Sequence, residues 1–243
     1  MMQVYFRKLY VWLWIISLLA ACTQSSEAFL DRARQLMKEQ KFSEALTFLN
    51  RAIEKDVDNF EAFNTRGVAY FEMKQYQEAL LDYDQAIKLN PGSYKPYYNR
   101  ARARIALKDM TGALADSHEA IRLQPDSADL YINRGFIYHQ EKKYKEAVTD
   151  FDKAILLNPT DANAFYNRGI ARFEMQDLSG SIADFKESVR LDVRSSKARF
   201  SLGIAQLLND EKEQGCSQLK QAERLGHSDA RSALMTYCEE AKK

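Results

Sequence analysis

Apolar and small residues recur along most of the chain with the spacing of amphipathic helices. Within residues 128–161, Tyr131, Gly135 and Tyr138 follow one another at intervals of four and three, so they share one helix face. A second stretch repeats this spacing after a short polar segment, and Pro159 follows its end. The residues of the second face are Ala147, Phe151 and Ala154. The pattern predicts two helices joined by a tight turn.

This helix pair recurs at an offset of 34 residues along the chain. Three of the four prolines, Pro91, Pro125 and Pro159, are spaced by that same interval. Equal units without insertions predict one supersecondary motif stacked six times. The residues that follow, 230–243, are expected to form a capping helix and tail, because the last unit of a stack exposes one apolar face. The six units are 26–59, 60–93, 94–127, 128–161, 162–195 and 196–229.

The repeated positions resemble those of the tetratricopeptide repeat. Each unit carries Gly or Ala at its eighth position, and units 1 to 4 carry Ala at the twentieth, where Ser181 and Gly215 follow in units 5 and 6. The eighth-position residues are Ala33, Gly67, Ala101, Gly135, Gly169 and Gly203. The resemblance implies an all-α fold, a right-handed superhelical solenoid of six 34-residue helix-turn-helix repeats closed by a C-terminal capping helix.

Arginine recurs at the seventh position of repeats 2 to 5 and aspartate at the twenty-third. Repeat 6 lacks both residues, and this paired occurrence predicts ion pairs that connect the helices within or between repeats. A basic ladder for acidic ligands is the alternative. The residues are Arg66, Arg100, Arg134 and Arg168, with Asp82, Asp116, Asp150 and Asp184.

The N-terminal segment differs from the repeats. Arg7 and Lys8 precede a run of 13 largely apolar residues, too short to span a bilayer and typical of a signal peptide at 1–21. The run ends Leu-Ala-Ala-Cys, which resembles the bacterial lipobox and implies cleavage before Cys22 and its acylation. Residues 22–25 would then be a lipidated tether on a periplasm-facing protein, with the outer membrane as the expected site. A plain signal anchor is the alternative.

The two remaining cysteines are expected to pair. Cys216 occupies a position that is apolar in the other five repeats, so it faces a neighbouring element. The next element is the capping helix, which carries Cys238. In an oxidising compartment this predicts a Cys216–Cys238 disulfide, and two buried free thiols are the alternative.

Candidate catalytic chemistry is not found in the sequence. The three histidines, His118, His139 and His227, lie outside any zinc-binding spacing, and no glycine-rich phosphate loop or nucleophile motif occurs. The net charge of +1 and the mixed charges do not favour nucleic acid. We therefore expect a non-enzymatic protein with no cofactor and no metal.

The resemblance implies that the first helices of the repeats line a concave groove. Amides and aromatics at groove positions can bind an extended peptide, although the aromatics can instead pack against the second helices. The predicted groove residues are Asn64, Phe71, Tyr98, Asn99, Asn133, Phe136, Tyr166, Asn167, Phe173 and Phe200. No three successive repeats supply the carboxylate clamp of chaperone cochaperones.

These features together predict a lipid-anchored adaptor of the cell envelope that holds a protein or peptide partner in the groove. The alternative is a structural solenoid whose apolar groove closes on a second copy.

Overall fold

The computed structural model describes residues 25–238, and within this range every regular element is an α-helix. The expected signal peptide, Cys22 and most of the tether lie outside the described residues. The helices divide into two units, residues 25–107 and 108–238, which are described separately. The boundary falls inside the third repeat.

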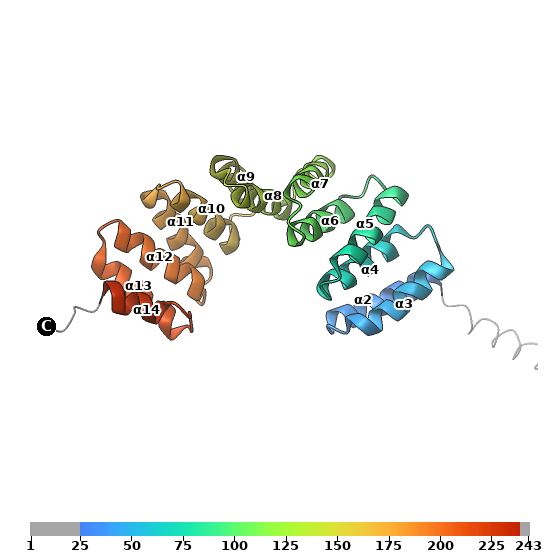
Figure 1. Cartoon of the computed structure of the whole chain (residues 1–243), viewed down its shortest axis with the longest axis horizontal. Coiled ribbons are helices and arrows are strands. Elements are labelled where there is room, and N and C mark those ends of the chain that lie inside the picture. The colour runs from blue at the N-terminus through green and yellow to red at the C-terminus, as the bar shows by residue number, and fades with distance from the viewer. Residues whose placement is uncertain (1–24, 239–243) are drawn as a thin grey trace, which may run out of the picture. The chain divides into compact units, whose positions relative to one another are not determined.

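The first unit contains five helices in the described range (Figure 1). Consecutive helices pack against one another, and α2 and α4, as well as α4 and α6, are also in contact. The helices are α2 (Ser26–Lys38), α3 (Phe42–Lys55), α4 (Phe60–Glu72), α5 (Tyr76–Leu89) and α6 (Tyr94–Ala106).

The second unit contains eight helices over its described residues (Figure 1). Here too each helix packs on the next, and α10 also contacts α8 and α12. The helices are α7 (Met110–Leu123), α8 (Ala128–Gln140), α9 (Tyr144–Leu157), α10 (Ala162–Glu174), α11 (Leu178–Leu191), α12 (Ser196–Leu208), α13 (Lys212–Arg224) and α14 (Ala230–Tyr237). The all-α class, with successive helix-turn-helix pairs followed by a last helix, is confirmed. We call the first helix of each pair (α2, α4, α6, α8, α10, α12) an A helix and the second (α3, α5, α7, α9, α11, α13) a B helix.

The tight turn between an A and a B helix depends on one left-handed residue. In the fourth repeat this residue is Lys142, with φ of 58°. Its N–H donates to the carbonyl of His139, and the N–H of Lys143 donates to that of Tyr138. These two hydrogen bonds form a Schellman motif. The motif provides donors for two carbonyl groups in the last turn of α8 and ends the helix in a tight turn. The equivalent left-handed residues are Gln40, Lys74, Lys108, Gln176 and Asp210.

Within a repeat, the A helix approaches the B helix where a glycine faces an aromatic ring. A Cβ on Gly135 would lie 2.7 Å from the ring of Phe151, and one on Gly67 would lie 2.5 Å from the ring of Tyr83. Both rings are only 1% exposed. The small eighth position therefore makes room for a large buried side chain of the facing helix.

The predicted Arg–Asp pairs connect A and B helices within repeats 2, 4 and 5. Arg66 donates through Nε and Nη2 to both carboxylate oxygens of Asp82, at 2.8 and 2.7 Å. Arg134 binds Asp150 with the same two distances. The hydrogen bonds to Asp82 raise the pKa of the Arg66 guanidinium, while burial raises the pKa of the Asp82 carboxyl.

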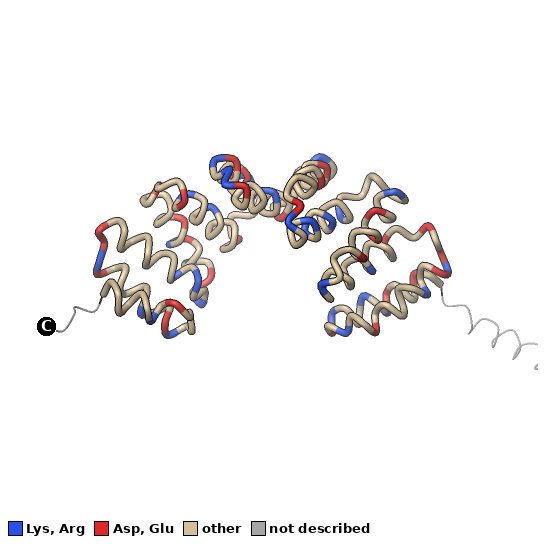
Figure 2. The backbone as a smooth tube through the Cα atoms, in the orientation of Figure 1, with Lys and Arg blue, Asp and Glu red and all other residues tan. Residues whose placement is uncertain are grey.

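The fifth repeat has the same pair, and Asp184 also accepts from Arg172. Asp184 is 2% exposed and its arginine partners are half-buried, so these ion pairs are partly buried and fix helix orientation more than they add stability. In the third repeat, Arg100 and Asp116 belong to different units. Elsewhere, acidic and basic residues are interspersed along the helices of each unit (Figure 2).

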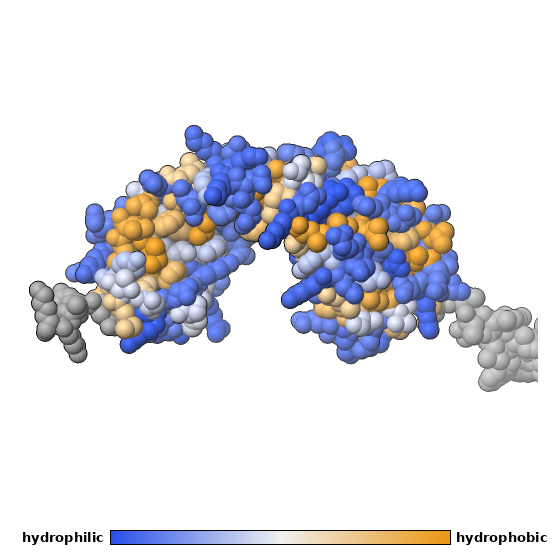
Figure 3. All heavy atoms as spheres, in the orientation of Figure 1, coloured by the Kyte–Doolittle hydropathy of each residue, from blue (hydrophilic) through white to orange (hydrophobic). Residues whose placement is uncertain are grey.

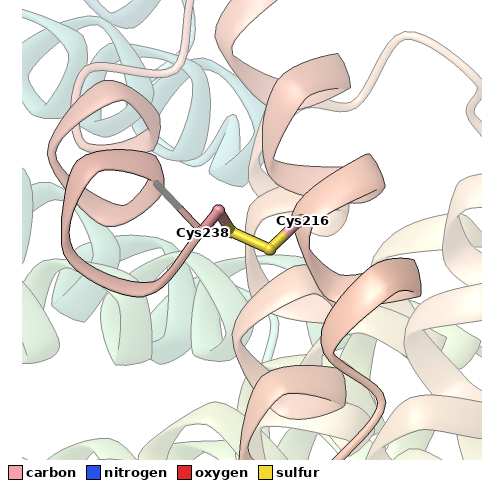
Figure 4. Close-up of a disulfide and its surroundings, with 2 residues drawn as sticks. All are labelled: Cys216 and Cys238. Carbon is pink, nitrogen blue, oxygen red and sulfur yellow. A yellow bond between two sulfur atoms is a disulfide. The ribbon is translucent and has the colours of Figure 1, made fainter. Parts of the chain in front are cut away.

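The last helix, α14, covers the end of the sixth repeat. Leu219 of α13 packs with Ala233 and Leu234 of α14 in one buried cluster. Cys216 and Cys238 form a disulfide in the structure, with their Cα atoms 5.7 Å apart (Figure 4). This is the pairing expected from the sequence, and it joins α13 to the residue that follows α14.

Candidate functional site

All ten predicted groove residues lie on A helices, and each keeps part of its surface accessible. Nine are half-buried, and Phe136 is 40% exposed. Four belong to the first unit and six to the second. The predicted side chains therefore lie on the A helices and are partly accessible to solvent. Many of them also pack against other residues of the protein. Figure 3 shows hydrophobic residues among hydrophilic ones on the drawn face of each unit.

In the first unit, the four predicted residues form two local groups on α4 and α6. The Asn99 side-chain amide donates to Asn64 Oδ1 at 3.0 Å, so the two amides satisfy part of each other's hydrogen bonding. Arg102 places its guanidinium carbon 4.7 Å from the Phe71 ring centroid and 5.8 Å from that of Tyr98. The aromatic residues thus flank a cation, an arrangement that holds the guanidinium in place.

The fourth repeat offers a polar and an apolar residue on α8. Asn133 accepts a hydrogen bond from Ser117 Oγ at 3.0 Å, so its amide NH₂ group stays available as a donor. Phe136 is the most exposed of the predicted aromatics. In this repeat the sequence places His139 at the next groove position, where its ring lies 5.5 Å from that of Tyr144.

A pocket of about 170 Å³ lies between α10 and α12 in the second unit. Phe173 and Phe200, both predicted groove residues, line this pocket. Tyr166 packs against the buried hydrophobic cluster that contains Phe185. The ring of Phe185, fully buried on α11, is part of the lining. We call this the α10/α12 pocket, and its lining residues are Ile170, Phe173, Phe185, Phe200, Ser201 and Ile204.

The position of Phe185 under this pocket depends on Gly169. A Cβ at Gly169 would lie 2.7 Å from the Phe185 ring, so any larger residue would displace that ring. Tyr166 lies beside Phe185, and their ring centroids are 5.9 Å apart. The packing of a glycine on the A helix against an aromatic ring on the B helix therefore shapes this pocket.

Two lining residues of the pocket also contact the last helices of the second unit. Phe200 stacks on His227, which lies in the loop before α14, with ring centroids 4.1 Å apart and planes 6° apart. Phe200 and Ile204 pack against the cluster of α13 and α14. The capping helix therefore supports one wall of the α10/α12 pocket.

A lysine that the sequence analysis did not select stands next to this pocket. Lys197 Nζ lies 4.6 Å from the Tyr166 ring centroid and donates to Asn163 Oδ1 at 3.2 Å. Arg102 and Ser201 were also not selected. The sequence gave no clear signal for Lys197, because four of the five equivalent positions in the other repeats are also charged: Glu27, Glu61, Lys95 and Asp129.

Between residues 25 and 238, no group of three or more His, Cys, Asp or Glu side chains is placed to hold a metal ion. His118 lies 3.3 Å from the Tyr138 hydroxyl, in an exposed contact. No helix in the same range is long and apolar enough to cross a membrane. The accessible A-helix faces, which include most of the lining of the α10/α12 pocket, are the candidate site.

Comparison with known families agrees with this architecture. Residues 60–93 match the model of the tetratricopeptide repeat, and residues 137–176 match a second model described as a TPR repeat. Proteins built from such repeats serve as interaction scaffolds that bind protein or peptide partners. No curated protein matches the chain.

Three solved structures share the fold at low identity. A chain of the APC/C hetero-tetramer Cut9-Hcn1 aligns with a TM-score of 0.77 and 16% identity over 96% of this chain and 46% of that one, so this chain spans about half its length. PilW, a type IV pilus biogenesis factor, aligns with a TM-score of 0.79 and 16% identity over 88% of this chain and all of PilW (100%). YrrB, a TPR protein with an unusual peptide-binding site, aligns with a TM-score of 0.63 and 19% identity over 77% of this chain and 97% of YrrB.

Proposed function

We propose that this chain is a non-enzymatic adaptor of the bacterial cell envelope that binds a protein or peptide segment on its A-helix faces. It would be anchored by lipid at Cys22, in the outer membrane and facing the periplasm. The anchor and the location rest on the lipobox-like Leu-Ala-Ala-Cys at the end of the apolar N-terminal run.

The observation that carries the binding function is the accessible apolar surface of the A helices. Phe173 and Phe200 line the α10/α12 pocket and Phe136 is 40% exposed, so packing within the protein leaves part of each aromatic side chain accessible to a ligand. Apolar surface of this kind next to polar groups is typical of sites that bind a partner. The peptide-binding site of YrrB and the pilus role of PilW support an adaptor, although they belong to those proteins.

The test is affinity capture from crosslinked, detergent-solubilised envelopes. The natural chain would be compared with a groove variant that carries Tyr98→Ala, Asn133→Ala and Tyr166→Ala. We expect a partner that the natural chain captures and the groove variant loses, because these substitutions remove accessible contact surface.

A matched control removes apolar surface from the B helices instead. Leu81 on α5 and Leu156 on α9 are 70% and 74% exposed, so Leu81→Ala with Leu156→Ala should leave the fold intact. Capture that survives the groove variant and fails with this control would contradict the proposal and place binding on the B helices.

A second candidate function is self-association. Met235 and Tyr237 on α14 are 58% and 54% exposed, which leaves an apolar surface at the end of the second unit. Sedimentation over a range of protein concentrations separates the two functions. A mass that doubles with concentration, and returns to that of one chain after Met235→Lys, would favour the structural role.

A further inference from the structure

The α10/α12 pocket has the size of a single large apolar side chain. Its volume is about 170 Å³, and a protein cavity of about 150 Å³ lined by Leu, Ile and Phe stays dry and binds benzene. Ser201 is its one polar lining residue, and Phe185 is completely buried behind it. The other lining side chains are half-buried, so the pocket is open to solvent on one side.

Lys197 gives the rim of this pocket a positive charge. It precedes Phe200 by three residues and Ser201 by four, so it lies on the same face of α12, one turn before the pocket. Its ammonium contacts the face of Tyr166 and the side-chain oxygen of Asn163, which are both uncharged. Among the described residues, no carboxylate lies within ion-pair distance of it.

The location of Lys197 in the helix suits an anionic ligand. It is in the first turn of α12, where the helix macrodipole favours negative charge, and that turn has no acidic residue. An anion bound at Lys197 would interact favourably with both the ammonium and the helix N-terminus. The present partners of Lys197 are Tyr166 and Asn163, which carry no charge, so they leave the ammonium charge unneutralised.

We propose that the α10/α12 pocket binds one phenylalanine- or leucine-sized side chain of a partner peptide, and that Lys197 binds the carboxylate of a neighbouring Asp or Glu of that peptide. The inference rests on the proposed adaptor function and names the chemistry of its ligand. The apolar side chain supplies affinity by leaving water, and the charge pair fixes which peptides fit.

The experiment selects random peptides displayed on phage against the full chain. The displayed peptides are fused to a coat protein, so they have no free carboxyl terminus, and any required acid is a side chain. We expect enrichment of peptides with Phe or Leu close to Asp or Glu. One enriched peptide is then synthesised with an amidated C-terminus and titrated by fluorescence anisotropy.

Two variants separate the two halves of the site. Ser201→Phe fills the pocket, and we expect it to weaken binding by roughly 10- to 100-fold, the equivalent of one apolar side chain. Lys197→Glu, at an exposed residue that does not support the core, should weaken binding by about tenfold or more. A peptide with Lys in place of its acid should bind Lys197→Glu better than it binds the natural chain.

Controls place the same chemical changes on B helices. Lys145→Glu on α9 and Ser179→Phe on α11 are at exposed positions away from the pocket lining, and both should leave the affinity unchanged. Circular dichroism of all four variants identifies any variant that fails to fold.

Three outcomes would overturn the inference: no enriched peptides, enrichment of peptides without the apolar and acidic pair, or binding that Lys197→Glu and Ser201→Phe leave intact. None of them affects the envelope capture test. If envelope capture depends on the A-helix faces but the peptide selection fails, the adaptor function is kept and this ligand chemistry is rejected.

Discussion

At the residue scale, the repeats balance volume between two facing positions. Gly135 faces Phe151, and Gly169 faces Phe185, whereas in the first repeat Ala33 and Leu49 stand at the corresponding positions. Both members of the first-repeat pair are fully buried. In the first repeat a methyl group on the A helix is therefore accepted opposite a leucine, whereas the sixth repeat pairs Gly203 with Leu219.

This balance predicts the effect of Gly135→Ala. The new Cβ would lie 2.7 Å from the Phe151 ring, so we expect the free energy of unfolding to fall by about 1–3 kcal/mol, in spite of the better helix propensity of alanine. Urea unfolding followed by circular dichroism measures the change.

Two further variants make the test specific. Gly135→Ala with Phe151→Leu recreates the first-repeat pair and should be less destabilised than the sum of its single changes. Gly92→Ala, at a site where a Cβ meets only Asn90 at 3.4 Å, should change stability by less than about 0.5 kcal/mol. Equal losses at Gly92 and Gly135 would show that the close approach to Phe151 is not the cause.

At the scale of elements, the capping helix depends on its covalent link. Helix α14 has only 8 residues, a length at which an isolated helix is not stable, and it is held by packing on Leu219 and by the Cys216–Cys238 disulfide. Because α14 and the preceding loop contact Phe200 and Ile204, its order also affects the α10/α12 pocket.

We predict that Cys216→Ser with Cys238→Ser opens α14 more than any other helix. In the chain-entropy model, a link across 22 residues contributes roughly 3 kcal/mol. Hydrogen exchange of α14 should therefore accelerate strongly, while α8, which makes no contact with the link, serves as the internal control.

Mass spectrometry under non-reducing conditions provides the companion measurement for the natural chain. A linked peptide containing both cysteines is expected after periplasmic expression. Two free thiols, or α14 exchange rates that the double variant leaves unchanged, would mean that packing alone holds the cap.

At the scale of the whole molecule, the decisive residue is Cys22, outside the described range. If it carries the lipid, the repeats begin only a few residues from the membrane surface, because residues 22–25 are the whole tether. If Cys22 is diacylated and N-acylated, as the lipobox resemblance implies, its three acyl chains would hold the protein on a membrane far more firmly than one chain.

Cys22→Ala should therefore give an unprocessed or soluble species that migrates more slowly on a gel. The measurement is fractionation of cells followed by immunoblotting. The Cys216→Ser and Cys238→Ser chain is the matched control and should stay with the membrane. Normal size and membrane partitioning of Cys22→Ala would reject the lipid anchor.

The repeat period made the fold predictable, because helix-turn-helix units bury their faces on immediate neighbours and need no distant contacts. The spacing of Arg66 and Asp82 also predicted an ion pair, and the structure shows that the pair connects the two helices of one repeat, as it does in repeats 4 and 5. The site was predicted only in part. Phe173 and Phe200 line the pocket, but Asn64 and Asn99 bind each other.

The sequence by itself determined the all-α class, the helix pairs and the face on which candidate binding residues lie, because each follows from local periodicity. Only the tertiary structure decided which of those residues form a pocket. The α10/α12 pocket depends on the gap between two A helices, on the Phe185 ring placed by Gly169, and on support from the loop before α14. These are contacts between separate elements, and side-chain packing sets their distances.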